Sequence, residues 1–289
     1  MEIYLASPEI THILEMHKRF HRKPNVLLSF ADVRTHFGHF VHTYRSRINK
    51  LMLDSGAFSE MRGTATVELD PLANYLKPCA GKFNYCVTLD INPEDYDLRM
   101  WNQAKLEEVA PNVLSAVHDP YAGEIDVLYD MGHQYILLGS SQGNDKRVLD
   151  FIFNRYHYSG RFPGIRFHKL GTATYPTLSG YPFCSSDSAR YAKAGGDGKA
   201  LFWNITREPS ANGDRTDEFY CGGRKIGANR GYRNYTEHPH LGEFEDYLWE
   251  TFRFRISDIV GRSKFDQRKL VNAKYMLDLE DVLTKLHGI

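Results

Sequence analysis

The sequence has no excess of charge of either sign, because 36 Lys and Arg residues balance 36 Asp and Glu residues among its 289. The whole-chain charge therefore gives no argument for a nucleic-acid partner, and local clusters must supply any such surface. No stretch approaches the ~20 apolar residues of a membrane span. The first six residues have the character of a strand rather than of a signal peptide with a basic front. We therefore expect a soluble, cytoplasmic protein.

Cysteine is scarce, with only Cys79, Cys86, Cys184 and Cys221. They form no CxxC pair, and no Cys/His cluster has the spacing of a zinc site, so we expect free thiols and no metal. A GxGxxG motif after the first strand is also missing, so nothing indicates a dinucleotide cofactor. With 42% hydrophobic residues, the chain can bury the core of one large domain, with or without a small appendage.

Apolar runs alternate with helical patterns along most of the chain. The runs lie at residues 1–6, 25–30, 51–54, 83–90, 112–117, 135–140, 165–172, 181–190 and 200–205. About eight strands with helices between them are typical of a parallel α/β protein, and a TIM-like (β/α)8 barrel fits their number and the chain length. A doubly wound open sheet is the alternative. We expect a catalytic barrel domain over 1–205, and an extension over 206–289 that completes the barrel and contacts nucleic acid.

Basic residues gather in this extension. Residues 222–234 contain four cations and no acid, and residues 251–274 contain seven Lys or Arg against two Asp. Tyr232, Tyr235 and Phe265 are interleaved with them. A solvated helix face is the ordinary explanation of such a run, and a surface for a phosphate backbone is the alternative.

Five polar residues and one glycine stand at the carboxyl ends of different predicted strands: Asp54, Asp90, His118, Gly139, His168 and Asp187. In a barrel these ends meet at one mouth, where active sites lie. Each residue alone has an ordinary explanation, such as a helix cap for Asp90 or Asp187. Three acids in one mouth, however, would repel one another and raise the pKa of at least one of them. A ring with N–H donors, such as guanine, would suit this arrangement.

The same residues resemble a known family. Asp54-Ser55-Gly56-Ala57-Phe58-Ser59 is similar to the Asp-Ser-Gly-Gly-aromatic-Gln signature of tRNA-guanine transglycosylases, βα-barrel enzymes that exchange guanine for a 7-deazaguanine base. The other matches follow in the family's order over residues 25–205. They are Asp90 for the aspartate that reads the base edge, His118 for a glutamine that contacts the base, Leu138-Gly139-Ser140 for a Gly-Gly-Leu loop, His168-Lys169-Leu170-Gly171-Thr172 for a Met-Gly-Val-Gly-Thr strand end, and Asp187 for the nucleophile.

The departures from the family are informative. The tRNA enzymes carry a Cys-x-Cys-x-x-Cys…His zinc site in a C-terminal insert, whereas this chain has only Cys221 in that region. Ala57, Ser59 and His118 also replace the family's Gly and its two Gln. These features look more like the DNA-modifying branch, found in phages and bacterial modification clusters, which inserts 7-deazaguanine derivatives into DNA. A phage-encoded protein of this kind would work in the host cytoplasm.

The resemblance implies a metal-free double displacement. Asp187 would form a covalent ester with the sugar, and Asp54 would protonate the departing guanine and deprotonate the incoming base. The expected substrate-binding residues are Ser55, Gly56, Phe58, Asp90, His118, Gly139, Ser140, His168 and Lys169. Among them, Phe58 would stack on the ring, a main-chain donor near Gly139 would bind the base carbonyl, and Lys169 could hold a flanking phosphate. A duplex substrate would require base flipping.

Three alternatives stay open at this point. The first is the same exchange on tRNA, and the second is a non-catalytic, nucleic-acid-binding partner. The third is a metal hydrolase built on a barrel from His118, Asp119, His168 and Asp187.

Overall fold

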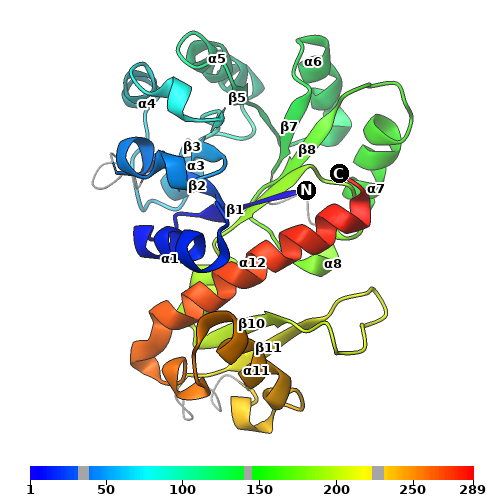
Figure 1. Ribbon diagram of the computed structural model, residues 1–289. Coiled ribbons are helices and arrows are strands. Elements are labelled where there is room, and N and C mark those ends of the chain that lie inside the picture. The colour runs from blue at the N-terminus through cyan, green and yellow to red at the C-terminus, as the bar shows by residue number, and fades with distance from the viewer. Residues whose placement is uncertain (32–38, 140–144, 223–230) are drawn as a thin grey trace.

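Nine short parallel strands form one nearly closed, barrel-like sheet in the computed structural model, which describes residues 1–31, 39–139, 145–222 and 231–289 (Figure 1). The strand order is β5-β4-β3-β2-β1-β9-β8-β7-β6. The strands are β1 (Glu2–Ala6), β2 (Asn25–Ser29), β3 (Leu51–Asp54), β4 (Tyr85–Val87), β5 (Val113–Leu114), β6 (Ala116–Val117), β7 (Tyr135–Leu138), β8 (Arg166–Lys169) and β9 (Ser185–Ser188).

The two ends of this sheet meet within one short segment of chain. β5 and β6 are separated only by Ser115, and they pair with β4 and β7 respectively. The Leu114 carbonyl accepts the Thr88 N–H, and the next carbonyl, of Ser115, accepts the Leu137 N–H. Residues 113–117 therefore act as one strand that bridges both neighbours, which gives the eightfold arrangement of a TIM-like barrel.

Alternation along each strand divides the core into two layers. Tyr4, Leu27, Met52 and Leu137 belong to an apolar cluster inside the barrel, whereas their chain neighbours pack in a second cluster beneath the helices. In β3, for example, Leu51 and Leu53 lie in the outer cluster and Met52 in the inner one. Because successive strand residues face opposite sides, a polar residue two positions after an inner apolar residue points into the barrel mouth.

Helices surround the sheet (Figure 1). Those around the barrel are α1 (Ile10–Phe20), α3 (Ala57–Met61), α4 (Leu69–Leu76), α5 (Tyr96–Glu107), α6 (Glu124–Asp130), α7 (Lys146–Ile152), α8 (Tyr175–Leu178), α9 (Arg190–Gly196) and α12 (Phe265–His287), whereas α11 (Leu241–Phe252) lies in the extension. Short helical turns are η1 (His39–Thr43), η2 (Arg45–Arg47), η3 (Ala80–Lys82), η4 (Pro120–Ala122), η5 (Phe153–His157), η6 (Tyr235–Glu237), η7 (Ile256–Asp258) and η8 (Arg262–Lys264). None of the helices described in these ranges is long and apolar enough to cross a membrane.

The last helix returns to the barrel after the chain has left it. α12 packs against β1, α1 and α9, and also against the separate sheet described next. Its Glu280 carboxylate accepts the Ile3 N–H at 2.7 Å and the Asn25 amide at 2.9 Å, which fixes the helix over the first two strands. Figure 1 shows α12, in red, lying between the barrel and the extension.

The apolar run at 200–205 does not join the barrel, contrary to its place among the predicted strands. It forms β10 (Lys199–Trp203), which pairs antiparallel with β11 (Thr216–Tyr220) in a two-stranded sheet of its own. Phe202 and Phe219 of this sheet pack on Phe244 of α11, so the run buries its side chains against the extension. Hydrophobicity alone cannot indicate which of two sheets a strand joins.

Part of the basic run at 251–274 has an internal role. Arg268 is buried and donates to the carbonyls of Gly195, Ile259 and Gly261. Lys269 pairs with Glu9 at 2.6 Å, and Lys274 pairs with Asp278 on the same helix. These three cations stabilise the fold and are not free for a phosphate backbone. Residues 223–230, which carry Arg224, Lys225 and Arg230, lie outside the described part of the chain.

Candidate functional site

Asp54 is the last residue of β3 and stands opposite Ser29 at the end of β2. Its Oδ2 accepts the Gly56 N–H at 3.1 Å. Burial raises the pKa of the Asp54 carboxyl to about 7, and the negative charges of Asp90 and Asp187 add to the effect, against smaller opposing contributions from Gly56 and Ser29. The three acids predicted from strand ends are therefore neighbours at one mouth.

Gly56 makes the turn after β3 possible. Its φ of 86° lies in the left-handed region, and a Cβ there would stand 2.8 Å from Cβ of Ala31 and 2.9 Å from the Ala31 nitrogen. Only glycine combines this conformation with so close an approach of two backbones. The turn aims the Gly56 N–H at Asp54, so Gly56 shapes the acid's surroundings whether or not it also contacts a ligand.

Asp187 lies on β9, in register with Tyr4 of the inner cluster. Its Oδ1 accepts the Gly171 N–H at 2.8 Å and lies 3.1 Å from Nε2 of His168. Within the described residues, Oδ2 has no hydrogen-bond donor. One oxygen is therefore held in place while the other is available at the mouth, which suits a carboxylate that must form a bond.

His168 is fully buried, so it supports Asp187 rather than contacting a substrate as predicted. Its Nδ1 bonds to the Ser185 hydroxyl, which in turn bonds to the hydroxyl of Tyr135. The Tyr4 ring packs edge-on against the imidazole. Ser185 and Tyr135 were not predicted from the sequence, where their only signal is that they occupy inward positions on their strands.

Asp90 and His118 form a pair on the neighbouring part of the rim. His118 Nε2 lies 2.8 Å from Oδ2 of Asp90, and the ring is half-buried. A side chain at Gly139 would stand 3.4 Å from Nδ1 of His118, so the glycine gives the ring its space. The pair can present an acceptor and an imidazole nitrogen to a planar base.

The N–H of Gly139 itself is not the main-chain donor expected near this residue. The Gly139 N–H bonds to the Val117 carbonyl at 3.3 Å as part of the barrel ladder, so it is not available to a base carbonyl. Ser140, the next predicted contact, lies outside the described residues.

A buried ion pair between α5 and α6, which was not predicted from the sequence, supports His118 from the side of the helices. Glu124 of α6 accepts the His118 N–H at 3.0 Å and pairs with Arg99 of α5, which also donates to the Ala116 carbonyl. A cavity of about 690 Å³ opens beside this pair between the two helices, lined in part by Tyr96 and Asp119. Two helices thus fix the rim where β6 ends.

Lys169 does not reach a flanking phosphate as predicted, because its side chain is fully buried. Its ammonium group donates to the Leu170 carbonyl at 3.1 Å. Burial lowers the pKa of Lys169 to about 8, and the Asp187 charge opposes that shift. Since His168 faces the barrel interior, its neighbour Lys169 faces the opposite side of the sheet.

The remaining predicted contacts lie around the first turn of α3. Phe58 is 56% exposed, and the Arg62 guanidinium lies 4.8 Å from its ring centre. Ser55 is buried, and its hydroxyl has no hydrogen-bond partner in the described part of the chain. Phe58 is therefore accessible for stacking, whereas Ser55 would need a ligand or water close to the turn.

The geometry disfavours the metal hydrolase. His118 bonds to Asp90, whereas His168 is buried behind Asp187. Asp119 is exposed and caps η4 by accepting the N–H groups of Tyr121 and Ala122. Across residues 1–31, 39–139, 145–222 and 231–289, the ligand atoms of these side chains do not gather into a cluster of three that could hold an ion.

What the mouth provides is a set of carboxyl groups in different environments. Burial raises the pKa of Asp54 to about 7, so that it can hold or release a proton near neutral pH, and within the described residues Asp187 has one anchored and one available oxygen. Such a pair suits displacement at a sugar carbon with a proton transfer.

No protein-family model matches the chain, and a search of curated proteins finds no match either.

Proposed function

We propose that this protein is a guanine transglycosylase that exchanges guanine in DNA for a 7-deazaguanine derivative. The observation that carries the proposal is the meeting of Asp54 and Asp187 at the barrel mouth, with the pKa of Asp54 raised to about 7. Replacing a base without cutting the strand calls for two displacements at one anomeric carbon. One carboxylate must bond to the sugar, and another must transfer a proton.

In the first displacement, Oδ2 of Asp187 attacks C1′ of the target nucleotide. The bond from C1′ to N9 of guanine breaks, its electron pair stays on the base, and Asp54 delivers a proton to the base. In the second, the incoming deazaguanine loses its N9 proton to Asp54. N9 then attacks C1′, and the ester bond to Asp187 breaks.

Asp54 suits both proton transfers because a pKa of about 7 lets it give and take a proton near neutral pH. Asp187 suits the covalent role because Gly171 and His168 hold only its Oδ1.

Asp90 and His118 would read the base. Asp90 offers acceptors for the ring N–H and exocyclic amine of guanine, which the incoming deazaguanine shares, and His118 keeps that carboxylate in place. Stacking on the exposed Phe58 would contribute about 1–3 kcal/mol. A duplex nucleotide must leave the base stack to reach a barrel mouth, so base flipping belongs to the proposal.

DNA is preferred over tRNA because of the sequence departures in the signature and the missing Cys₃His insert. The same exchange on tRNA is the second candidate. A non-catalytic, nucleic-acid-binding subunit is disfavoured because both Asp54 and Asp187 are present and lie near each other.

The direct test is incubation of the purified protein with DNA or tRNA labelled in guanine, together with candidate 7-deazaguanines. We expect release of label from DNA, its loss in Asp187→Asn and Asp54→Asn, and its retention in Asp119→Asn. The last variant is a matched control, because Asp119 stands on the same rim but only caps η4. Release from tRNA alone would favour the second candidate, and tight binding without release would favour the non-catalytic subunit.

A further inference from the structure

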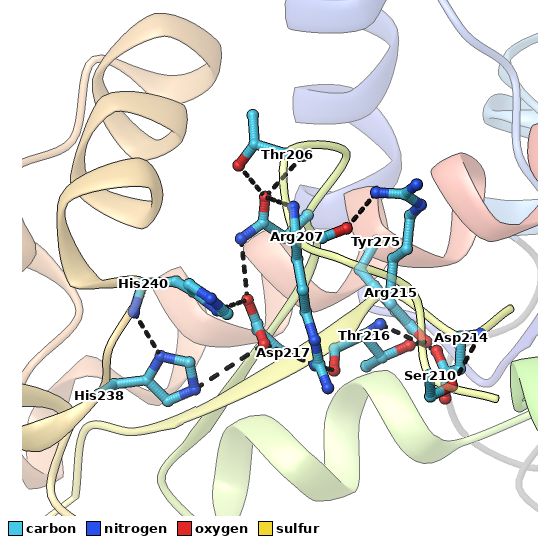
Figure 2. Close-up of polar contacts among 11 residues, drawn as sticks. Thr206, Arg207, Ser210, Asp214, Arg215, Thr216, Asp217, His238, His240 and Tyr275 are labelled. Atoms are coloured by element: carbon cyan, nitrogen blue, oxygen red, sulfur yellow. Dashed lines mark hydrogen bonds and ion pairs between the residues drawn. The ribbon is translucent and has the colours of Figure 1, made fainter.

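Two histidines and one aspartate converge in the extension, away from the barrel mouth. Asp217 lies on β11 and is buried, and His238 and His240 lie in the turn between η6 and α11. Figure 2 shows both imidazole rings directed at the Asp217 carboxylate. One ligand atom from each residue lies within 4.8 Å of the other two.

The surrounding residues hold these three groups in place. Oδ2 of Asp217 lies 2.8 Å from Nδ1 of His240 and 3.0 Å from the Asn204 amide nitrogen. Oδ1 accepts the Arg207 guanidinium at 2.7 Å. The His238 ring packs on Phe219, with centroids 4.0 Å apart, and its Nε2 lies 3.9 Å from Oδ1 of Asp217.

We infer that Asp217, His238 and His240 form a binding site for one divalent transition metal ion, with Zn²⁺ as the best fit. Two imidazole nitrogens and one carboxylate oxygen are the ligand types that Zn²⁺ takes in tetrahedral sites, with water in the fourth position. Partners of the carboxylate such as Asn204 and Arg207 orient a metal ligand in the way that outer-shell contacts do elsewhere.

Two features of the cluster bear on how the ion would enter. Nδ1 of His238 accepts the His240 N–H at 3.2 Å, so coordination through Nε2 requires that this long hydrogen bond be given up and Nδ1 take the proton. Nδ1 of His240 must likewise lose its bond to Asp217. Arg207 can stay, because it occupies the other carboxylate oxygen. On binding, two metal–nitrogen bonds replace the two hydrogen bonds made by Nδ1 of His238 and Nδ1 of His240. The His238 ring is partly exposed.

The ion would join two segments that are distant in sequence. β11 belongs to the hairpin with β10, and the histidine turn leads into α11. Figure 2 also shows Thr216 beside Tyr275 of α12, a contact of 2.9 Å that ties the same hairpin to the last helix. The site therefore has a structural role in the extension, and it does not depend on the proposed transglycosylase activity.

The test uses the full-length protein after treatment with a chelator and its removal. Co²⁺ is titrated while the visible ligand-field absorption is followed, and Zn²⁺ is then added as competitor. We expect one Co²⁺ per chain, displacement by Zn²⁺, and a higher melting temperature with either ion. The affinity should fall more than about 100-fold in His238→Asn and in His240→Asn.

Two variants act as controls. His42→Asn changes an exposed histidine elsewhere and should leave binding unchanged. His12→Asn alters a second cluster, with Glu9 and Asp266, in which Lys269 already pairs with both acids, and it should also bind normally. Absence of stoichiometric binding to the wild-type protein would overturn the inference regardless of how the variants fold. The inference would also be overturned if the His238 and His240 variants bound Co²⁺ as tightly as the wild type does, or if only the His12 variant lost binding.

Discussion

The imidazole of His168, which is fully buried, places its Nε2 3.1 Å from Oδ1 of Asp187 at the barrel mouth. Because the ring is anchored through Ser185 at its other nitrogen, it fixes the orientation of the carboxylate. We predict that His168→Phe lowers kcat about tenfold to hundredfold, the effect of losing one hydrogen bond to a charged group, with KM for DNA unchanged. Steady-state kinetics would show this, and His168→Asn, which keeps a donor, should recover part of kcat. A rise in KM alone would contradict a positioning role.

The pH dependence of guanine release should report Asp54. The acid must be protonated to donate to the leaving base, and its pKa is about 7. Single-turnover release should therefore be constant at lower pH and fall as the pH rises above about 7. A profile without this decline between pH 6 and 8 would contradict the assignment, provided that release itself is the step measured.

Asp54→Asn should change the pH dependence of stability. The folded pKa is raised from 3.8 to about 7, so between these values the folded protein holds a proton that the unfolded chain releases. The unfolding free energy of the wild type therefore falls as pH rises through this window. The variant lacks this loss, and its melting temperature should exceed that of the wild type at pH 8 and approach it near pH 4. If the melting temperatures of the variant and the wild type differed by the same amount at both pH values, Asp54 would not titrate as described.

Gly56 and Gly63 allow a matched comparison at the two ends of α3. Both have positive φ, but a Cβ at Gly56 meets Ala31 at 2.8 Å, whereas one at Gly63 meets nothing within 4 Å. Gly56→Ala should cost about 1–3 kcal/mol more in unfolding free energy than Gly63→Ala, because only the former adds overlap to backbone strain. Chemical denaturation would measure both. An equal loss of unfolding free energy in the two variants would show that the turn at Gly56 can shift enough to relieve the contact with Ala31.

The sequence was sufficient to place the three acids at the mouth. Asp54 and Asp187 follow strand patterns in which inward and outward positions alternate, and parallel strands end together at one rim. The same rule was less useful for His168 and Lys169. His168 does face the barrel interior, but it pairs with Ser185, two residues before Asp187, and so lies below the mouth. Lys169 falls on the opposite face of the sheet, and strand ends are not predictable to one residue.

The helical contributions had no signal in the sequence. Arg99 and Glu124 stand on α5 and α6, where charged residues are ordinarily exposed, and only the packed fold turns them toward the rim. The cluster of Asp217, His238 and His240 likewise had no signal in the sequence, because a long stretch of chain separates the aspartate from the two histidines. Long-range pairing of this kind depends on topology rather than on local pattern.

The covalent step is the central claim, and trapping it is the most direct measurement. The protein is mixed with DNA without an incoming base, denatured, and examined by intact mass and peptide mapping. We predict an adduct whose linkage maps to Asp187. It should disappear when a 7-deazaguanine is added before denaturation, because the second displacement breaks the ester bond. Its absence from wild-type protein under conditions of guanine release, or its persistence in Asp187→Asn, would contradict the account.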